Sequence, residues 1–202
     1  MENPVYAIQT DRLLIRAYNP TDAVIVKDAV DASIEHLRPW MPWVQFEPTA
    51  LDKKIAMLRR WRGQFDLNTD FVYGAFSADN DMLIGSTGLH TRPSGNGLEI
   101  GYWIRAGESG RGYATEIAAA LCRAAFEIIG VDYLEIHCDP VNTASAHVAE
   151  KLGFRDEYTR RVKPGSPTEA GNSEQVWILF RNEYTNPPQK IKFFDALGEP
   201  IS

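Results

Sequence analysis

Two glycines one residue apart precede an apolar helix pattern in SGRGYATEIAAALC, residues 109–122. Glycine at 110 and 112 leaves the backbone N–H groups unobstructed and permits positive φ. The helix that follows adds the positive end of its dipole, and Arg111 adds a cation beside it. This spacing predicts a backbone site for an anion, although a tight turn without a ligand would use the same glycines.

The residues around this turn restrict which anion it could bind. A Walker loop is excluded because no Gly-Lys-Ser/Thr follows Gly112. The dinucleotide fingerprint G-x-G-x-x-G also fails, because Thr115 stands where its third glycine belongs. A nucleotide-binding module of another kind remains an alternative, and it predicts that ATP or NAD would bind.

Asn142 and Ser145 form a second polar pair at a helix start. Asn142 precedes a helical pattern over 143–152, where its side chain is suited to cap the helix. Ser145 shares a face with Val148 and Leu152, so it should point inward. A buried hydroxyl needs a partner, which is either its own helix turn or a ligand.

Hydrophobic periodicity predicts the elements that position these residues. Strands are expected over 13–18, 71–78, 82–90, 97–104, 133–139, 155–162 and 174–184. Helices are expected over 21–33, 51–65, 114–129 and 143–152, with an irregular, structured loop over 36–43. Short connections favour an antiparallel meander over 71–104, and Gly101 within it suggests a bulge or a close approach. The order of elements predicts an α+β domain with one mixed sheet flanked by helices.

The expected domain covers residues 1–184, and residues 185–202 form a C-terminal tail or arm. A double proline opens this tail, and Leu197-Gly198 could turn a small hairpin. The tail could pack locally or reach a partner subunit, as it would in a homodimer.

Composition indicates an ordinary globular protein. The chain of 202 residues has 44% hydrophobic and 24% charged residues, with a formal net charge of -6. The negative charge argues against a nucleic-acid partner. No apolar run approaches the ~20 residues of a membrane span, and no signal peptide precedes the domain, so we expect a cytoplasmic protein. Cys122 and Cys138 fit buried thiols in a reducing compartment, and the spacing of Cys and His predicts no metal site.

Several motifs in order resemble the GNAT acetyltransferase superfamily. The segments SGRGYA (109–114) and NTASAHVAEKLGF (142–154) are similar to its two core motifs, with Ser109 where the family usually has Gln or Arg. TDRLLIRAYNPTDA (10–23), HLRPW (36–40) and GYW (101–103) look like the RimJ/RimL branch, whose members acetylate protein N-termini or small amines. The resemblance spans roughly residues 10–184 and implies the GNAT fold.

The resemblance implies an acetyl-CoA site built mostly from backbone. Pyrophosphate donors would come from the loop and first helical turn, with Thr115 nearby and Asn142 beside the cofactor. The strand 97–104 would pair with the pantetheine arm, and a backbone N–H there would face the oxyanion. The implied cofactor-binding residues are Trp103, Ile104, Arg105, Gly110, Arg111, Gly112, Tyr113, Ala114, Thr115 and Asn142.

Two residues are the predicted catalytic groups. Many superfamily members protonate the departing sulfur with a Tyr, but its slot here is Ala149, so we assign this role to Ser145. Attack requires a neutral amine, and Glu99 is the predicted general base. The alternatives are His90 and His137, and the segment 162–174 adds Glu169 and Glu174.

Trp40 and Trp43 would line the acceptor side, where core packing is the competing role. The sequence thus predicts an N-acetyltransferase that moves an acetyl group from acetyl-CoA to a primary amine, most simply a protein N-terminal α-amine, with no metal, nucleic acid or membrane involved. The alternatives are a small-molecule amine acceptor (an antibiotic, a polyamine or an amino acid) and a non-catalytic acyl-CoA-binding regulator.

Overall fold

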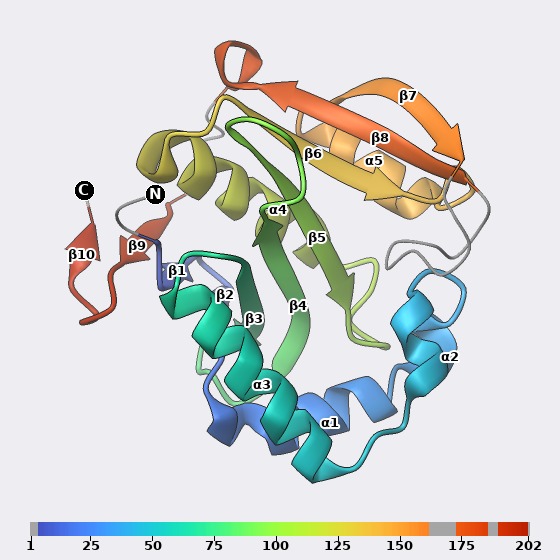
Figure 1. The fold of residues 1–202 in the computed structure, drawn as a ribbon, viewed down its shortest axis with the longest axis vertical. Helices are drawn as coiled ribbons and strands as arrows, with labels where there is room; N and C mark the ends of the chain where they lie inside the picture. The colour runs from blue at the N-terminus through green and yellow to red at the C-terminus, as the bar shows by residue number, and fades with distance from the viewer. Residues whose placement is uncertain (1–3, 162–172, 186–189, 202) are drawn as a thin grey trace.

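The computed structural model describes residues 4–161, 173–185 and 190–201, and its strands form one sheet (Figure 1). The order of strands is β10-β9-β1-β2-β3-β4-β5-β6-β8-β7. Every neighbouring pair is antiparallel except β5 and β6, which are parallel. The fold is therefore α+β with a mixed, mostly antiparallel sheet, as predicted.

The elements of the described ranges lie close to the predicted ones. The strands are β1 (Ala7–Gln9), β2 (Leu13–Ala17), β3 (Phe71–Ser77), β4 (Leu83–His90), β5 (Gly97–Ile104), β6 (Tyr133–Cys138), β7 (Arg155–Arg161), β8 (Ser173–Phe180), β9 (Lys192–Phe194) and β10 (Pro200–Ile201). The helices are α1 (Ala23–Asp31), α2 (Ile34–Leu37), α3 (Leu51–Asp66), α4 (Tyr113–Arg123) and α5 (Thr143–Lys151). The antiparallel meander of β3, β4 and β5 is confirmed.

Three local predictions needed correction. Residues 36–43 are not wholly irregular, because α2 enters them and Pro42–Phe46 forms a 3-10 turn. Pro42 opens this turn, where the missing N–H costs no hydrogen bond. The predicted helix 114–129 changes to a π-helical stretch at Ala124–Ile129. The last strand ends at Phe180, before a 3-10 turn.

Two apolar clusters lie against the sheet. In the larger one, Ile117 and Leu121 of α4 and Val148 of α5 pack with Leu98 and Ile100 of β5. We call the side of the sheet that they cover the α5 face.

The second cluster gathers around α1. Val26 and Val30 of α1 pack with Leu83 of β4, and Trp103 of β5 packs against this group. We call this side of the sheet the α1 face. Because successive side chains of a strand point to opposite faces, Tyr102 lies on the α5 face, whereas Glu99 lies on the α1 face with Trp103.

The described part of the tail extends the sheet at its far end (Figure 1). β9 pairs with β1, and β10 pairs with β9, so the predicted hairpin around Leu197-Gly198 is confirmed. Phe193 of β9 is buried in the larger cluster. The domain boundary at residue 184 stays a prediction. Among the described helices, none is long and apolar enough to cross a membrane.

Candidate active site

The loop from β5 to α4 carries three glycines with left-handed backbone. The φ angles are +86° at Gly107, +78° at Gly110 and +80° at Gly112, which is the N-cap of α4. The described part of the chain supplies no acceptor for the amide N–H groups from Gly110 to Thr115. A Cβ added at Gly110 would meet only open space. The loop and first turn, residues 110–115, thus present free donors at a helix N-terminus, and we call them the cradle.

A buried carboxylate ties the start of α4 to the turn between β1 and β2. Glu116, in the first turn of α4, accepts hydrogen bonds from Thr10 Oγ1 at 2.6 Å and from Arg12 Nε at 2.7 Å. Arg12 also donates to the Arg111 carbonyl at 3.0 Å and lies 4.4 Å from the centre of the Tyr113 ring. Sequence reasoning missed this connection. Its only signal was an acidic residue in the first turn of a helix.

Two contacts join the same loop to the helices of the α1 face. Arg105 pairs with Asp28 of α1 at 2.7 Å. The hydroxyl of Ser109 lies 3.1 Å from His36 Nε2 of α2. Ser109, the departure from the family pattern, therefore contacts α2.

Next to the cradle, one edge of β5 has no strand partner in the described sheet. β5 and β6 pair only through Gly97–Glu99 and Tyr133–Glu135, and the two strands then diverge (Figure 1). The remainder of β5 has no ladder partner on that side in the described sheet. Arg105 donates its N–H to Ile84 of β4 at 2.8 Å. Because N–H groups alternate along a strand, that of Ile104 faces the open side, whereas that of Trp103 faces β4.

Gly101 makes room for a histidine ring. The β4–β5 register shows no shift, so no bulge lies at Gly101, and the close-approach alternative is confirmed. A Cβ added at Gly101 would lie 3.1 Å from His90 Nε2, and one at its partner Gly88 would lie 2.7 Å away. His90 Nδ1 lies 2.9 Å from Asp70 Oδ1. The imidazole therefore rests on the two glycines of the α1 face.

Hydroxyl groups from both walls meet where β5 and β6 diverge. Ser145 Oγ lies 2.9 Å from Tyr102 Oη, and the Ser145 N–H donates to Asn142 Oδ1 at 3.2 Å. Asn142 therefore caps α5, as its sequence position suggested. Sequence reasoning did not single out Tyr102, although strand alternation placed it on the same face as Ser145.

The thiol of Cys138, at the end of β6, lies beside this pair. Burial raises the pKa of the Cys138 thiol, and the Ser145 hydroxyl partly offsets this. Burial also raises the pKa of Tyr102, so its hydroxyl stays protonated.

Glu99 belongs to a charged cluster on the α1 face. Its carboxylate accepts a hydrogen bond from Arg92 Nη1 at 2.6 Å and lies 3.7 Å from His137 Nδ1. The same imidazole lies 2.7 Å from Glu135 and 3.5 Å from Glu174. Glu174 and Glu99 thus lie on the same imidazole in the structure, while Glu169 lies outside the described residues.

His137 carries a positive charge in this cluster. Burial alone would lower its pKa, but hydrogen bonds to Glu135 and Glu174 and the charge of Glu99 raise the pKa of His137 to about 9. A protonated imidazole cannot take a proton, which leaves Glu99, His90 and Glu174 among the predicted bases in the described residues.

The two predicted acceptor-side tryptophans lie in the 36–46 segment. The Trp43 ring packs against Trp103 with centroids 6.2 Å apart, so this segment reaches the α1 face at Trp103, four residues along β5 from Glu99. Trp40 is half-buried.

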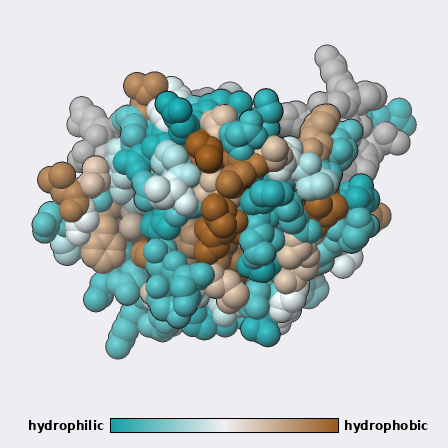
Figure 2. Space-filling model, turned by 90° about the horizontal axis from the view of Figure 1, so that it is seen from below, coloured by the Kyte–Doolittle hydropathy of each residue, from teal (hydrophilic) through white to brown (hydrophobic). Residues whose placement is uncertain are grey.

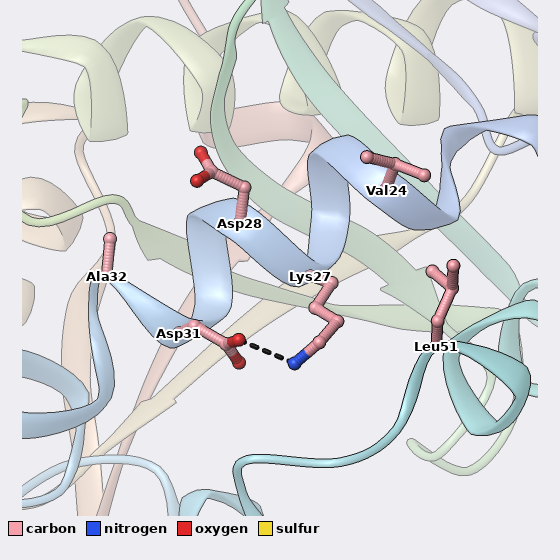
Figure 3. Close-up of a pocket in the computed structure, with 6 residues that line it drawn as sticks. All are labelled: Val24, Lys27, Asp28, Asp31, Ala32 and Leu51. Carbon is pink, nitrogen blue, oxygen red and sulfur yellow. Dashed lines mark hydrogen bonds and ion pairs between the residues drawn. The ribbon is translucent and has the colours of Figure 1, made fainter.

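A separate hollow lies between α1 and the start of α3 (Figure 3), and it is lined by Val24, Lys27, Asp28, Asp31, Ala32 and Leu51. Figure 2 shows apolar side chains gathered on the face seen from below, the end where α1 and α3 lie in Figure 1. Exposed apolar residues on these helices include Val24, Leu51 and Ile55. The hollow contains none of the predicted site residues. Within the described ranges, no group of His, Cys, Asp and Glu side chains is arranged to hold a metal ion.

Comparison with known proteins identifies the family of the chain. The model of the Acetyltransferase (GNAT) domain family matches residues 12–155. The chain is 26% identical over 160 residues to the [Ribosomal protein uS5]-alanine N-acetyltransferase of Escherichia coli, which covers 76% of this chain and 80% of that protein.

Solved structures share the fold. The ribosomal-protein-S5-alanine acetyltransferase of Vibrio fischeri aligns with a TM-score of 0.75 and 17% identity, covering 89% of this chain and 98% of its own. RimL, a ribosomal L7/L12 α-N-protein acetyltransferase in complex with coenzyme A, aligns with a TM-score of 0.75 and 17% identity, covering 85% and 95%. With free amides in the cradle and an open edge of β5 beside it, the chain belongs to the GNAT acetyltransferase family and is an acetyl-CoA-dependent N-acetyltransferase.

Proposed function

We propose that the chain acetylates the α-amine of a protein N-terminus, with a ribosomal protein as the most direct acceptor class. The Escherichia coli relative, an alanine N-acetyltransferase of ribosomal protein uS5, supports this acceptor. Such an enzyme would act in the cytoplasm, where new N-termini appear. The observation that carries the proposal is that β5 pairs with β6 only through Gly97–Glu99, so the part of β5 next to the cradle keeps an edge without a strand partner among the described residues.

The cradle would hold the pyrophosphate of acetyl-CoA. Backbone amides of the cradle would donate to its oxygens, and Thr115 and Asn142 would lie alongside. The free edge of β5 would then pair with the pantetheine arm through Ile104, as an added strand would. The side chains of Trp103 and Arg105 would border the arm.

The acceptor would approach from the α1 face. A peptide N-terminus carries an ammonium group, which Glu99 would attract into the space bordered by Trp43 and Trp103, with Trp40 further out. Glu99 would take the proton, and the neutral amine would attack the thioester carbonyl directly. The amide N–H of Ile104 would stabilise the oxyanion, and Ser145 would face the departing sulfur.

Binding and turnover test this proposal together. We expect calorimetry to show selective binding of acetyl-CoA over ATP and NAD. Free-thiol release should then be seen with peptides bearing a free α-amine and lost with the same peptides blocked at that amine. Release with small amines alone would move the acceptor class to small molecules. Binding of acetyl-CoA without thiol release from any amine would show a non-catalytic regulator.

A further inference from the structure

The hydroxyl groups of Tyr102 and Ser145 connect β5 to α5, at the place where β5 no longer pairs with β6. Tyr102 comes from the part of β5 that has left β6, and Ser145 comes from the first turn of α5. Their oxygens are 2.9 Å apart, a normal O–H···O distance. The phenol proton has a second, longer acceptor in the Ser145 carbonyl oxygen at 3.4 Å, so the contact to Ser145 Oγ is the shorter of the two.

The direction of this hydrogen bond decides what Ser145 can do. A serine hydroxyl has one proton and can also accept. If Ser145 Oγ accepts from Tyr102, its own proton is free to point into the cleft. Because the pKa of Tyr102 is raised by burial, the phenol keeps the proton it donates at every working pH. When one hydroxyl donates to a second, the hydrogen bond that the second hydroxyl donates becomes stronger.

The side chains of Cys138, Trp177 and Asn142 lie around the Tyr102–Ser145 pair. None of these three is an anion that would attract the Ser145 proton. The Cys138 thiol has a raised pKa and stays neutral, and the buried indole N–H of Trp177, which has no hydrogen-bond partner in the described structure, can only donate. Asn142 Oδ1 already accepts from the Ser145 backbone N–H. The helix slot four residues beyond Ser145 is Ala149, which is fully buried and brings no hydroxyl.

We propose that Tyr102 is the positioning residue for leaving-group departure: it donates to Ser145 Oγ, so that Ser145 donates its hydrogen bond to the sulfur of CoA. The inference rests on the proposed acetyl transfer. In that step the C–N bond forms and the C–S bond breaks, and the electron pair of the C–S bond goes to sulfur. Glu99, once it has passed the first proton of the ammonium group to bulk water, takes the second proton from the amine nitrogen as the C–N bond forms. The thiolate, stabilised by Ser145, takes a proton from water after it departs.

The first test is a double-mutant cycle on acetyl transfer. Removing one hydroxyl in Tyr102→Phe should lower kcat about tenfold, and Ser145→Ala should lower it further. The double variant should equal Ser145→Ala, because Tyr102 acts only through Ser145. The Kd for acetyl-CoA should stay unchanged, and each variant should be fully folded at the assay temperature, as its thermal unfolding curve will show. Tyr73→Phe is the matched control, because its buried hydroxyl bonds the Val5 carbonyl away from the cleft. A full tenfold loss from Tyr102→Phe in the Ser145→Ala background would overturn the proposal.

The second test needs no acceptor and therefore separates this proposal from the choice of acceptor. The ultraviolet absorbance of the thiolate reports ionisation of CoA bound to the enzyme, with a titration of the free enzyme subtracted to remove Cys122 and Cys138. In the wild-type enzyme, the thiol of bound CoA should ionise at a lower pH than the thiol of free CoA titrated alongside it. Tyr102→Phe and Ser145→Ala should both raise the pKa of the bound thiol. Equal titrations in all three enzymes would overturn the proposal, even if an acceptor is found.

Discussion

At the scale of single residues, Glu99 combines burial with two cationic neighbours. It is 4% exposed, and Arg92 and His137 contact its carboxylate. Glu99→Gln keeps the shape but cannot accept the amine proton. We expect kcat/KM to fall about 100-fold while the Kd for acetyl-CoA is unchanged. Glu157→Gln, in an exposed pair with Arg155, is the control. A Glu99→Gln enzyme with near wild-type kcat/KM would transfer the base role to His90.

The protonation of His137 should make the stability of the fold depend on pH. Its pKa is raised from 6.5 to about 9 in the folded protein. The charged cluster therefore stabilises the fold fully below pH 6.5, and this contribution is lost as pH rises to about 9. Denaturant titrations should show the free energy of unfolding falling more steeply across this window in the wild type than in His137→Gln. The exposed His147→Gln should behave like the wild type. Parallel curves for wild type and His137→Gln would contradict a charged imidazole.

At the scale of elements, the cradle depends on glycine backbone rather than on side chains. Gly112 has φ +80°, and an added Cβ would meet only Arg12 at 3.7 Å. Gly112→Val should fold, with a strain cost of about 1–2 kcal/mol, and should weaken acetyl-CoA binding at least tenfold by crowding the free amides. Gly198→Val is the matched control, because φ is +79° there in a distant hairpin. Equal acetyl-CoA affinity in both variants would remove the cradle from the binding site.

Elements with strong periodicity could be predicted from the sequence, and contacts between elements could not. Strand 97–104 appears with its predicted bounds as β5, because alternation and flanking turns are local signals. β1 was missed, because three residues carry no period and one of its two partners, β9, lies at the other end of the chain. The Tyr102–Ser145 contact depends on where α5 docks against β5, which no local pattern reports. Ser145 and the glycines were found because helix starts have sequence signals of their own.

At the scale of the whole molecule, the cleft and the C-terminal hairpin lie in different parts of the sheet. β9 is separated from β5 by β1, β2, β3 and β4, yet Phe193 is 5% exposed in the same core cluster as Leu98. Burial of Phe193 should therefore stabilise the fold without shaping the cleft.

Phe193→Ala tests this separation. Loss of the buried ring should lower the free energy of unfolding by about 3 kcal/mol, measured by denaturant titration. The kcat and the Kd for acetyl-CoA should match the wild type at a temperature where both proteins are folded. Sedimentation should give the same mass for both, because Phe193 packs within its own chain. A change in mass would instead assign the tail to a partner subunit, and a loss of kcat alone would connect the hairpin to the cleft.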